Sequence, residues 1–481
     1  MKVAPSPRIF HVLLIIVGSW QMVMILHGSN LDTVGVTLLR AVTTNVNGSG
    51  IRVAQPEAAL SNNPPTWEIN PANVGQPASM FTYIAYAGSA TVYPNTLGTN
   101  SWHAEDVGNN FYGIPNGVAT NIADVDNYGA DYFYTSIIAV TFPANINDRV
   151  VNQSFIFTES DGSHSTVGDQ QAIDSNYDDY AARFSTLFVS GAGNGSPMQV
   201  NPPATCYNGI GVGVSDGSSS VGPTIDNGRA KPDIIAPGGA TSFSTPYVAG
   251  AAAVLMQAGL RGNGGSDTNS AADIRTIKSL LLNGAIKPPD WTNNSPSPLD
   301  ARYGAGVLNV FNSYEQLAGG KHGYIVSTSV STGGAHPPTG ATGTVSTLSG
   351  WDFNTNSSNI NFDGVNHYYF NVINSPSNTA FTATITLIWN RQLNQTGINN
   401  LDLFLYNAAN SNLVAASTSV VDNVEHIWLP QLPQGRYDLQ VLKNGGTNTI
   451  SYSETYALAW EFFSMPLTMA QSGTNAALTW P

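Results

Sequence analysis

The feature that most constrains the fold is an alternation of short β-branched runs with helical patterns from Gly35 to about Leu317. Such alternation is typical of a strand, a crossover helix and a parallel strand. Buried-strand runs occur at residues 50–54, 149–154 and 187–190. Helical patterns occur at residues 170–184, 246–257 and 271–283. We therefore predict an α/β domain over residues 30–320, with a parallel sheet flanked by helices.

The composition changes after Gly319. Gly, Ser, Thr and Pro dominate residues 333–350, which predicts a linker over residues 321–350. Residues 351–465 then alternate between strand patterns and turn signals without a helical period. This pattern predicts an all-β sandwich of jelly-roll-like type. Residues 466–481 are interpreted either as the start of a further β unit, which suggests a fragment of a longer protein, or as a tail.

The N-terminus has the order of an export signal. Lys2 and Arg8 precede an uncharged apolar run from Ile9 to Leu26. The run also approaches the ~18 residues of a membrane-spanning helix. Residues 1–29 are therefore interpreted either as a cleaved signal peptide or as an uncleaved signal anchor. In both cases we expect the protein to be secreted, periplasmic or on the cell surface, touching a membrane only through such an anchor.

The net charge of the chain limits the kinds of molecule that it can bind. The chain has 17 Lys and Arg against 31 Asp and Glu, so its formal charge is 17 − 31 = −14. So few basic residues provide no electrostatic surface for a polyanion, which argues against nucleic acid as a partner. The single cysteine, Cys206, cannot form an internal disulfide and is interpreted as an inert core thiol.

The segment with the clearest chemical signal is KPDIIAPGGATSFSTPYVAGAAAVLMQ at residues 231–257. Thr241 and Ser242 lie just before Pro246, a residue suited to a helix start. A hydroxyl at a helix N-terminus sits where negative charge is stabilised, so Ser242 is a candidate nucleophile. The alternative is that Thr241 and Ser242 only cap the helix.

This segment resembles the serine-site signature of the subtilisin-like serine peptidases, with its PD..APG lead-in and GTSMATPHVAG core. Ala240 and Tyr247 stand where the family usually has Gly and His. The resemblance implies that Ser242 attacks the peptide carbonyl. A histidine then takes its proton, and an acidic residue orients the imidazole. The family order along the chain is acid, histidine, serine.

Only His103 and His164 lie between the N-terminal strands and Ser242. His103 begins a segment, residues 103–119, that resembles the family's HGTHVAG motif followed by its GVAP turn. His164 lies in the flexible-looking loop ESDGSHST. The resemblance therefore favours His103 as the general base.

The family's acid ends a strand, in an Asp-Ser/Thr-Gly motif that a G.G turn precedes. The carboxylates upstream of His103 are Asp32, Glu57 and Glu68. Only Glu57, in GSGIRVAQPEAA, follows a strand with a G.G lead-in. A glutamate can also orient an imidazole, so we expect Glu57 to orient His103. The alternative is a solvent-facing Glu57 and an impaired site.

Two more site residues come from the resemblance. The segment LFVSGAGNGSP resembles the family's AAAGN motif, and it implies Asn194 as the side-chain oxyanion donor. The alternative is that Asn194 belongs to a simple turn. Ser154 corresponds to the strand that pairs with the substrate backbone. The next three residues replace the family's small SLGG residues, so the specificity pocket stays undefined.

The resemblance covers residues 48–317 and implies protein or peptide substrates, a monomer, and catalysis without a cofactor. Calcium is a common structural ion of exported members, but no site can be named. The strands of residues 401–462 resemble the bacterial pre-peptidase C-terminal β-domain, an accessory fold of secreted peptidases. We predict an exported endopeptidase that uses Ser242, His103 and Glu57. The alternative is an inactive subtilase-fold protein secreted for binding or adhesion.

Overall fold

The computed structural model describes residues 29–159, 161–195, 198–373, 380–464, 468–472 and 475–479. The predicted export segment, with its apolar run from Ile9 to Leu26, lies outside these residues. Across the described ranges, no helix is both long enough and apolar enough to cross a bilayer.

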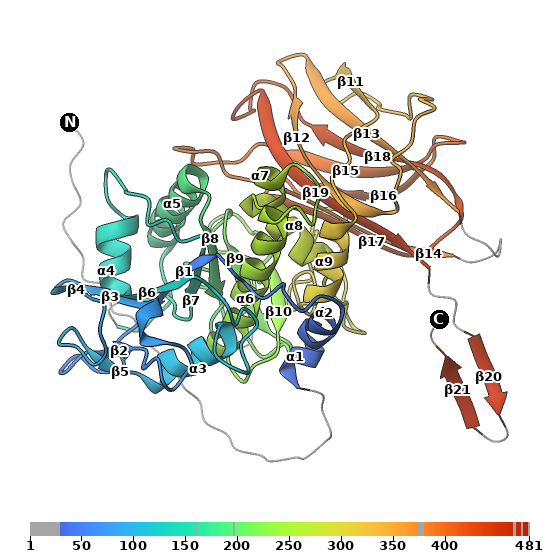
Figure 1. Ribbon diagram of the computed structural model, residues 1–481. Coiled ribbons are helices and arrows are strands. Elements are labelled where there is room, and N and C mark those ends of the chain that lie inside the picture. Colours follow the sequence, from blue (N-terminus) through green and yellow to red (C-terminus); the bar gives the residue numbers. More distant parts are fainter. Residues whose placement is uncertain are drawn as a thin grey trace.

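An eight-stranded sheet forms the first half of the chain, in the order β10-β9-β8-β7-β1-β6-β3-β4 (Figure 1). All neighbours are parallel except β3 and β4. The strands are β1 (Arg52–Glu57), β3 (Phe81–Ala85), β4 (Gly88–Ala90), β6 (Asp124–Gly129), β7 (Val150–Gln153), β8 (Leu187–Gly191), β9 (Ile210–Val214) and β10 (Ile234–Ala236). A separate pair is formed by β2 (Thr66–Glu68) and β5 (Thr99–Asn100). The parallel α/β core predicted from the sequence is therefore confirmed.

Helices surround this sheet. They are α1 (Asn30–Thr33), α2 (Val36–Val42), α3 (Trp102–Phe111), α4 (Ala130–Tyr132), α5 (Val167–Phe184), α6 (Thr241–Leu260), α7 (Thr268–Ala271), α8 (Ile274–Asn283) and α9 (Val310–Ala318), with short turns η1 (Ala78–Met80) and η2 (Phe133–Ile138). The predicted helix at residues 271–283 is interrupted, because Asp273 caps a new helix by accepting a hydrogen bond from the N–H of Arg275.

Helix α6 is the central helix of the domain. It packs along β7, β8, β9 and β10 and against α3. Its small residues permit this approach: a Cβ on Gly250 would lie 3.1 Å from the carbonyl oxygen of Phe111 at the end of α3. The helix that carries Ser242 is therefore held directly against the helix that carries His103.

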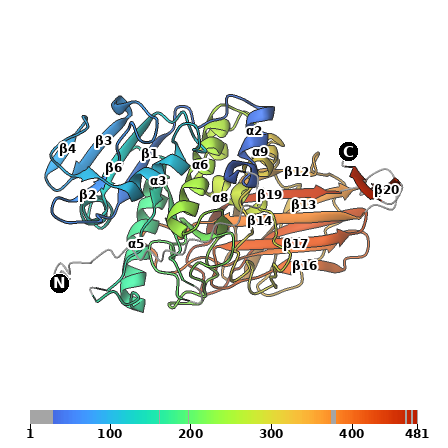
Figure 2. The same ribbon diagram turned by 90° about the horizontal axis from the view of Figure 1, so that it is seen from below.

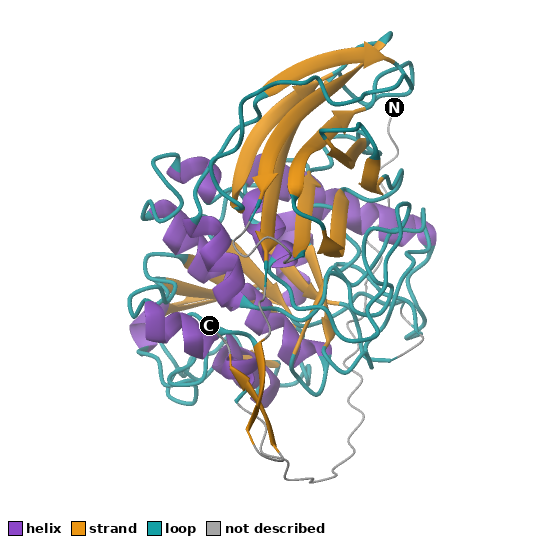
Figure 3. Cartoon of the chain, turned by 90° about the vertical axis from the view of Figure 1, so that its right-hand side faces the viewer, coloured by secondary structure: helices purple, strands orange, loops and turns teal. Residues whose placement is uncertain are grey.

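The second half consists of two antiparallel sheets that share one apolar core, consistent with a β-sandwich (Figure 3). One sheet has the order β11-β13-β18-β15-β16 and the other β12-β19-β14-β17. Their strands are β11 (Val326–Ser331), β12 (Ser349–Ser357), β13 (Phe362–Val372), β14 (Phe381–Trp389), β15 (Leu401–Asn407), β16 (Leu413–Ser417), β17 (Val424–Leu432), β18 (Gly435–Lys443) and β19 (Ser453–Phe463). Strand β11, inside the expected linker, pairs with β13. A separate hairpin follows, formed by β20 (Thr468–Ser472) and β21 (Asn475–Thr479).

The four-stranded sheet packs against α8 and α9 (Figure 2). Its residues Trp351, Ile388, Val424 and Ala459 belong to the same apolar cluster as the core of the α/β domain. The indole N–H of Trp351 also donates to the carbonyl of Leu317 at 3.1 Å. The two halves therefore share a continuous hydrophobic core.

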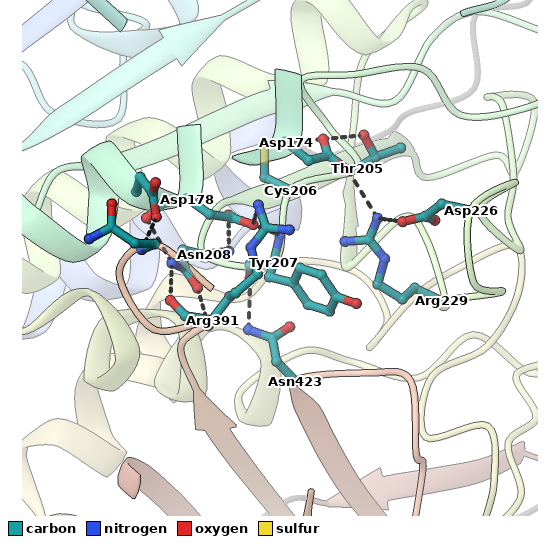
Figure 4. A network of polar contacts seen from close by, with 12 residues as sticks. Asp174, Asp178, Thr205, Cys206, Tyr207, Asn208, Asp226, Arg229, Arg391 and Asn423 are labelled. Carbon is teal, nitrogen blue, oxygen red and sulfur yellow. Dashed lines mark hydrogen bonds and ion pairs between the residues drawn. The ribbon is translucent and has the colours of Figure 1, made fainter. Parts of the chain in front are cut away.

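A buried polar network joins the same two halves (Figure 4). Arg391, which follows β14, forms an ion pair of 3.0 Å with Asp178 of α5. The side chain of Asn208 bonds the backbone of Arg391 twice, accepting from its N–H at 2.8 Å and donating to its carbonyl at 3.0 Å. Asn423 donates to the carbonyl of Tyr207 at 2.9 Å. These contacts hold the β-sandwich against α5 and against residues 207–208 of the α/β domain.

Cys206 lies in this network as a buried thiol. Burial raises the pKa of Cys206 well above its ordinary value, and the nearby Asp174 adds to the effect. A thiol that resists ionisation is a poor nucleophile. This agrees with the interpretation of Cys206 as an inert core residue.

Candidate active site

The candidate residues lie at one edge of the parallel sheet. Glu57 ends β1, Ser154 follows β7, and Asn194 follows β8. Parallel strands carry their carboxyl ends at a common edge, so these three side chains converge. His103 and Ser242 occupy the first turns of α3 and α6. The fold thus gathers residues that are nearly two hundred positions apart in the chain.

Glu57 and His103 form a buried pair. Oε2 of Glu57 lies 2.9 Å from Nδ1 of His103, and the two residues are 1% and 3% exposed. A carboxylate at this distance accepts the Nδ1 proton and leaves Nε2 as the basic nitrogen. The side chain of Glu57 is therefore turned inward to the histidine rather than to solvent.

A second residue of β1 supports this pair. The side-chain amide of Gln55 donates to Oε1 of Glu57 at 2.8 Å and to the carbonyl of Ala104 at 2.9 Å. The amide oxygen of Gln55 accepts a hydrogen bond from the hydroxyl of Tyr112 at 2.7 Å. These hydrogen bonds of Gln55 were not predicted from the sequence. Their signal was the two-residue spacing of Gln55 and Glu57, which puts both side chains on one face of the strand.

The other two upstream carboxylates lie elsewhere. Asp32 is exposed in α1 and accepts a hydrogen bond from the N–H of Ser29. Glu68 is buried in β2, where its Oε2 accepts from Asn95 at 3.2 Å. Burial raises the pKa of Glu68. Of the three candidates, only Glu57 contacts His103.

Ser242 sits in the first turn of α6. The sequence suggested that Pro246 lies at the start of the helix. The helix begins earlier, at Thr241, so Pro246 lies inside it. Proline has no N–H, and the carbonyl of Ser242 is left without its usual helical partner. The hydroxyl of Ser154 donates to that carbonyl at 2.9 Å. Ser154 therefore supports the backbone of the candidate nucleophile.

The hydroxyl of Ser242 does not cap the helix. It donates to the carbonyl of Ser154 at 3.3 Å, while the N-cap residue Ala240 has no side-chain bond. Within the described chain, Nε2 of His103 has no hydrogen-bond partner. The ring of His103 packs 5.8 Å from that of Phe243, the next residue after Ser242. The serine and histidine are thus neighbours, and their hydrogen bond is not formed in this arrangement.

Asn194 faces Ser242 from the end of β8. Its amide oxygen accepts from the N–H of Thr241 at 2.8 Å and from the Thr241 hydroxyl at 3.0 Å. These two donors fix the orientation of the amide, so its NH₂ group is directed away from Thr241. Among the backbone N–H groups of the first helical turn, that of Thr241 donates to Asn194, and those of Phe243 and Ser244 donate to the carbonyl of Ala240. The site thereby provides hydrogen-bond donors beside the candidate nucleophile.

A pocket opens beside Ser242. Ser154, Phe155 and Ile156 line one side, and Gly193 and Asn194 line another. Phe155 and Ile156, which stand where the family has small residues, thus form part of the pocket wall. His164, the second histidine considered as a base, also lines this pocket and does not contact Glu57. Its ring bonds Asn201, with Nδ1 of His164 2.9 Å from Nδ2.

No cluster of three or more His, Cys, Asp or Glu side chains suited to a metal ion occurs within the ranges described above. The expectation of a structural calcium therefore stays without a site.

Comparisons with known proteins find one matching family and several similar solved structures. Residues 87–306 match the Subtilase family. The self-cleaved protease domain of PatA is 21% identical, with a TM-score of 0.39 over 57% of this chain and 99% of that one. The prenylagaramide maturation protease PagA is 19% identical, with a TM-score of 0.38 over 59% and 98%.

A protease from Pseudoalteromonas arctica PAMC 21717 is 22% identical, with a TM-score of 0.38 over 60% of this chain and 94% of that one. The family match spans His103, Ser154, Asn194 and Ser242, and Glu57 lies before it. The chain is therefore similar to the Subtilase family over residues 87–306.

Proposed function

We propose that the chain is an exported serine endopeptidase with a Ser-His-Glu triad. Ser242 is the nucleophile, His103 the general base, Glu57 the orienting acid and Asn194 the oxyanion donor. The observation that carries this proposal is the buried 2.9 Å contact between Glu57 and His103, next to the first turn of α6. A hydrogen-bonded acid and histidine beside a serine at a helix start are the parts that acyl transfer requires.

The first half of the reaction forms an acyl-enzyme. Rotation of the Ser242 side chain moves its hydroxyl from the carbonyl of Ser154 toward Nε2 of His103, a contact that catalytic pairs often complete only with substrate bound. Nε2 takes the hydroxyl proton as Oγ attacks the substrate carbonyl. The carbon–nitrogen bond then breaks, and the amine leaves with the proton from Nε2. Glu57 stabilises the imidazolium that exists between these two transfers.

The negative charge of the tetrahedral intermediate needs fixed donors. The NH₂ group of Asn194, held in place by Thr241, and the backbone N–H of Ser242 serve this role. In the second half, His103 takes a proton from water and the resulting hydroxide displaces Oγ of Ser242. His103 returns this proton to Oγ as the ester bond breaks, so the acid product leaves and the serine hydroxyl is restored.

The substrate we propose is a protein or peptide bound in extended form. Residues 154–156 run beside the nucleophile and offer backbone groups to which a substrate strand can bond. Export rests on the apolar run after Lys2 and Arg8. Fractionation of cells that express the full chain tests this part, with the protein expected outside the cytosol. Recovery in the cytosolic fraction alone would contradict it.

Labelling with a fluorophosphonate tests the enzymatic proposal. This reagent phosphonylates activated serines with loss of fluoride, so we expect one adduct on the wild-type chain, located to Ser242 by peptide mass spectrometry. Ser242→Ala is expected to give no adduct, and His103→Ala a greatly reduced one. Equal labelling of wild type and Ser242→Ala would reject the assignment.

A second candidate function is a secreted binding or adhesion protein without activity. It is favoured by the hydrogen bond that the hydroxyl of Ser242 donates to the carbonyl of Ser154, because this hydroxyl is then not bonded to His103. The labelling experiment separates the two functions. An unlabelled wild-type chain that is folded would support the binding protein.

A further inference from the structure

The pocket beside Ser242 contains a histidine that the proposed reaction does not use. His164 lines the pocket together with Phe155, Ile156 and Met198. In the proposed endopeptidase, this pocket would receive P1, the substrate residue whose carbonyl Ser242 attacks. The question is which side chain its walls accept.

Charge in the pocket argues against a basic side chain. Among the described residues that line it, none is Asp, Glu, Lys or Arg, and His164 is the titratable one. The acidic residues nearest in the chain, Glu159 and Asp161, are not among the described residues that line it. A lysine or arginine at P1 would therefore be buried without a carboxylate partner, which is costly.

The hydrogen bonds around His164 assign its tautomer. The N–H of Ser165 donates to Oδ1 of Asn201 at 3.2 Å, which directs the NH₂ group of Asn201 to Nδ1 of His164 at 2.9 Å. Nδ1 is therefore an acceptor, and the neutral ring carries its proton on Nε2. His164 thus offers one N–H donor.

The backbone around His164 is also fixed. An antiparallel bridge pairs His164 with Thr158. The hydroxyl of Ser165 donates to the carbonyl of Phe157 at 3.0 Å. A donor held on a braced backbone loses little freedom when a ligand binds, so it can discriminate between ligands.

We propose that His164 selects the P1 side chain, and that the pocket prefers glutamine and glutamate. Both have an apolar stem that can pack against Phe155 and Ile156, and both end in an oxygen that can accept the Nε2 proton of His164. This inference rests on the proposed peptidase function, since it names the substrate class of that site.

A peptide series that varies only at P1 tests the proposal. With internally quenched peptides carrying Gln, Glu, Met or Lys, we expect kcat/KM for Gln and Glu to exceed that for Met by about tenfold or more. Methionine matches the length of glutamine without its amide, so the Gln/Met ratio isolates the hydrogen bond. Lysine is expected to be the poorest of the four.

His164→Leu is expected to lower the Gln/Met ratio by about tenfold, because the donor is removed and an apolar wall remains. Ser163→Ala, a change at the exposed neighbouring residue, is the matched control and should keep the wild-type ratio. An unchanged ratio in His164→Leu, or a wild-type preference for Lys, would overturn the proposal.

Failure of the pocket assignment can be told apart from failure of the peptidase function. A fluorophosphonate without a P1 side chain reports on Ser242 alone. Labelling of Ser242 together with an unchanged Gln/Met ratio rejects the role of His164 and keeps the peptidase. A folded wild-type chain that is not labelled rejects both.

Discussion

The side-chain amide of Gln55 donates a hydrogen bond of 2.8 Å to Oε1 of Glu57, the oxygen that does not face His103. This bond holds the longer glutamate side chain in one position, so Gln55 acts as a positioning residue. Its own amide is oriented in turn by Tyr112. The acid of the proposed triad thus belongs to a chain of three buried groups.

Replacing Gln55 should weaken turnover without weakening substrate binding. We expect Gln55→Leu to lower kcat by about tenfold to a hundredfold, as is typical when an outer partner of a catalytic group is lost. KM should stay near the wild-type value. Tyr112→Phe removes only the hydrogen bond from Tyr112 to Gln55, so it should have a smaller effect on kcat. Steady-state kinetics that show a raised KM with an unchanged kcat would assign Gln55 to substrate binding instead.

Removal of the Asn194 donor should slow the chemical step. We expect Asn194→Ala to lower kcat by about 10²–10³, because the oxyanion loses one preorganised hydrogen bond. Thr241→Val keeps the donor but removes one of its two supports, so its loss should be smaller. Peptide hydrolysis measures both variants. A variant Asn194→Ala with wild-type kcat would remove Asn194 from the site.

The ion pair between Arg391 and Asp178 should stabilise the whole chain. Both side chains are nearly inaccessible to water, and removing one partner leaves a buried charge. We expect Arg391→Met to reduce the free energy of unfolding by about 3 kcal/mol. Arg302→Met, in a pair of exposed side chains with Asp290, should change it by less than ~1 kcal/mol. Denaturant unfolding compares them, and equal effects would contradict the buried network.

Stability should also fall as pH rises through the range of Glu454. Burial raises the pKa of Glu454 from about 4.5 to about 7 in the folded protein. The folded state therefore binds this proton more tightly, and the resulting stability is present below about pH 4.5 and lost between about pH 4.5 and pH 7. The loss is on the order of 3 kcal/mol.

Glu454→Gln keeps an oxygen for Asn399 and Gln392, and it should remove that pH dependence. Unfolding measured at pH 5 and pH 8 gives the comparison. If the variant and the wild type lose the same stability over this interval, the titrating group is another residue.

The sequence predicted the local parts of this molecule well. The patterns at residues 170–184 and 246–257 are helices α5 and α6, because their apolar spacing is a local property. The strand ending at Glu57 was also predictable from its G.G lead-in. The contact of Arg391 with Asp178 could not be predicted, since it joins distant segments with no shared pattern. The role of Thr241 in holding Asn194 depends on how β8 meets α6, which only the folded chain determines.

The most direct test of the account is the turnover of Glu57→Gln. The glutamine is isosteric but cannot stabilise the His103 imidazolium, so we predict a fall in kcat of about 10⁴ for peptide hydrolysis. Glu57→Asp keeps the carboxylate and should retain much more of the activity. Asp32→Asn and Glu68→Gln should behave like wild type. Wild-type turnover in Glu57→Gln would contradict the Ser-His-Glu triad.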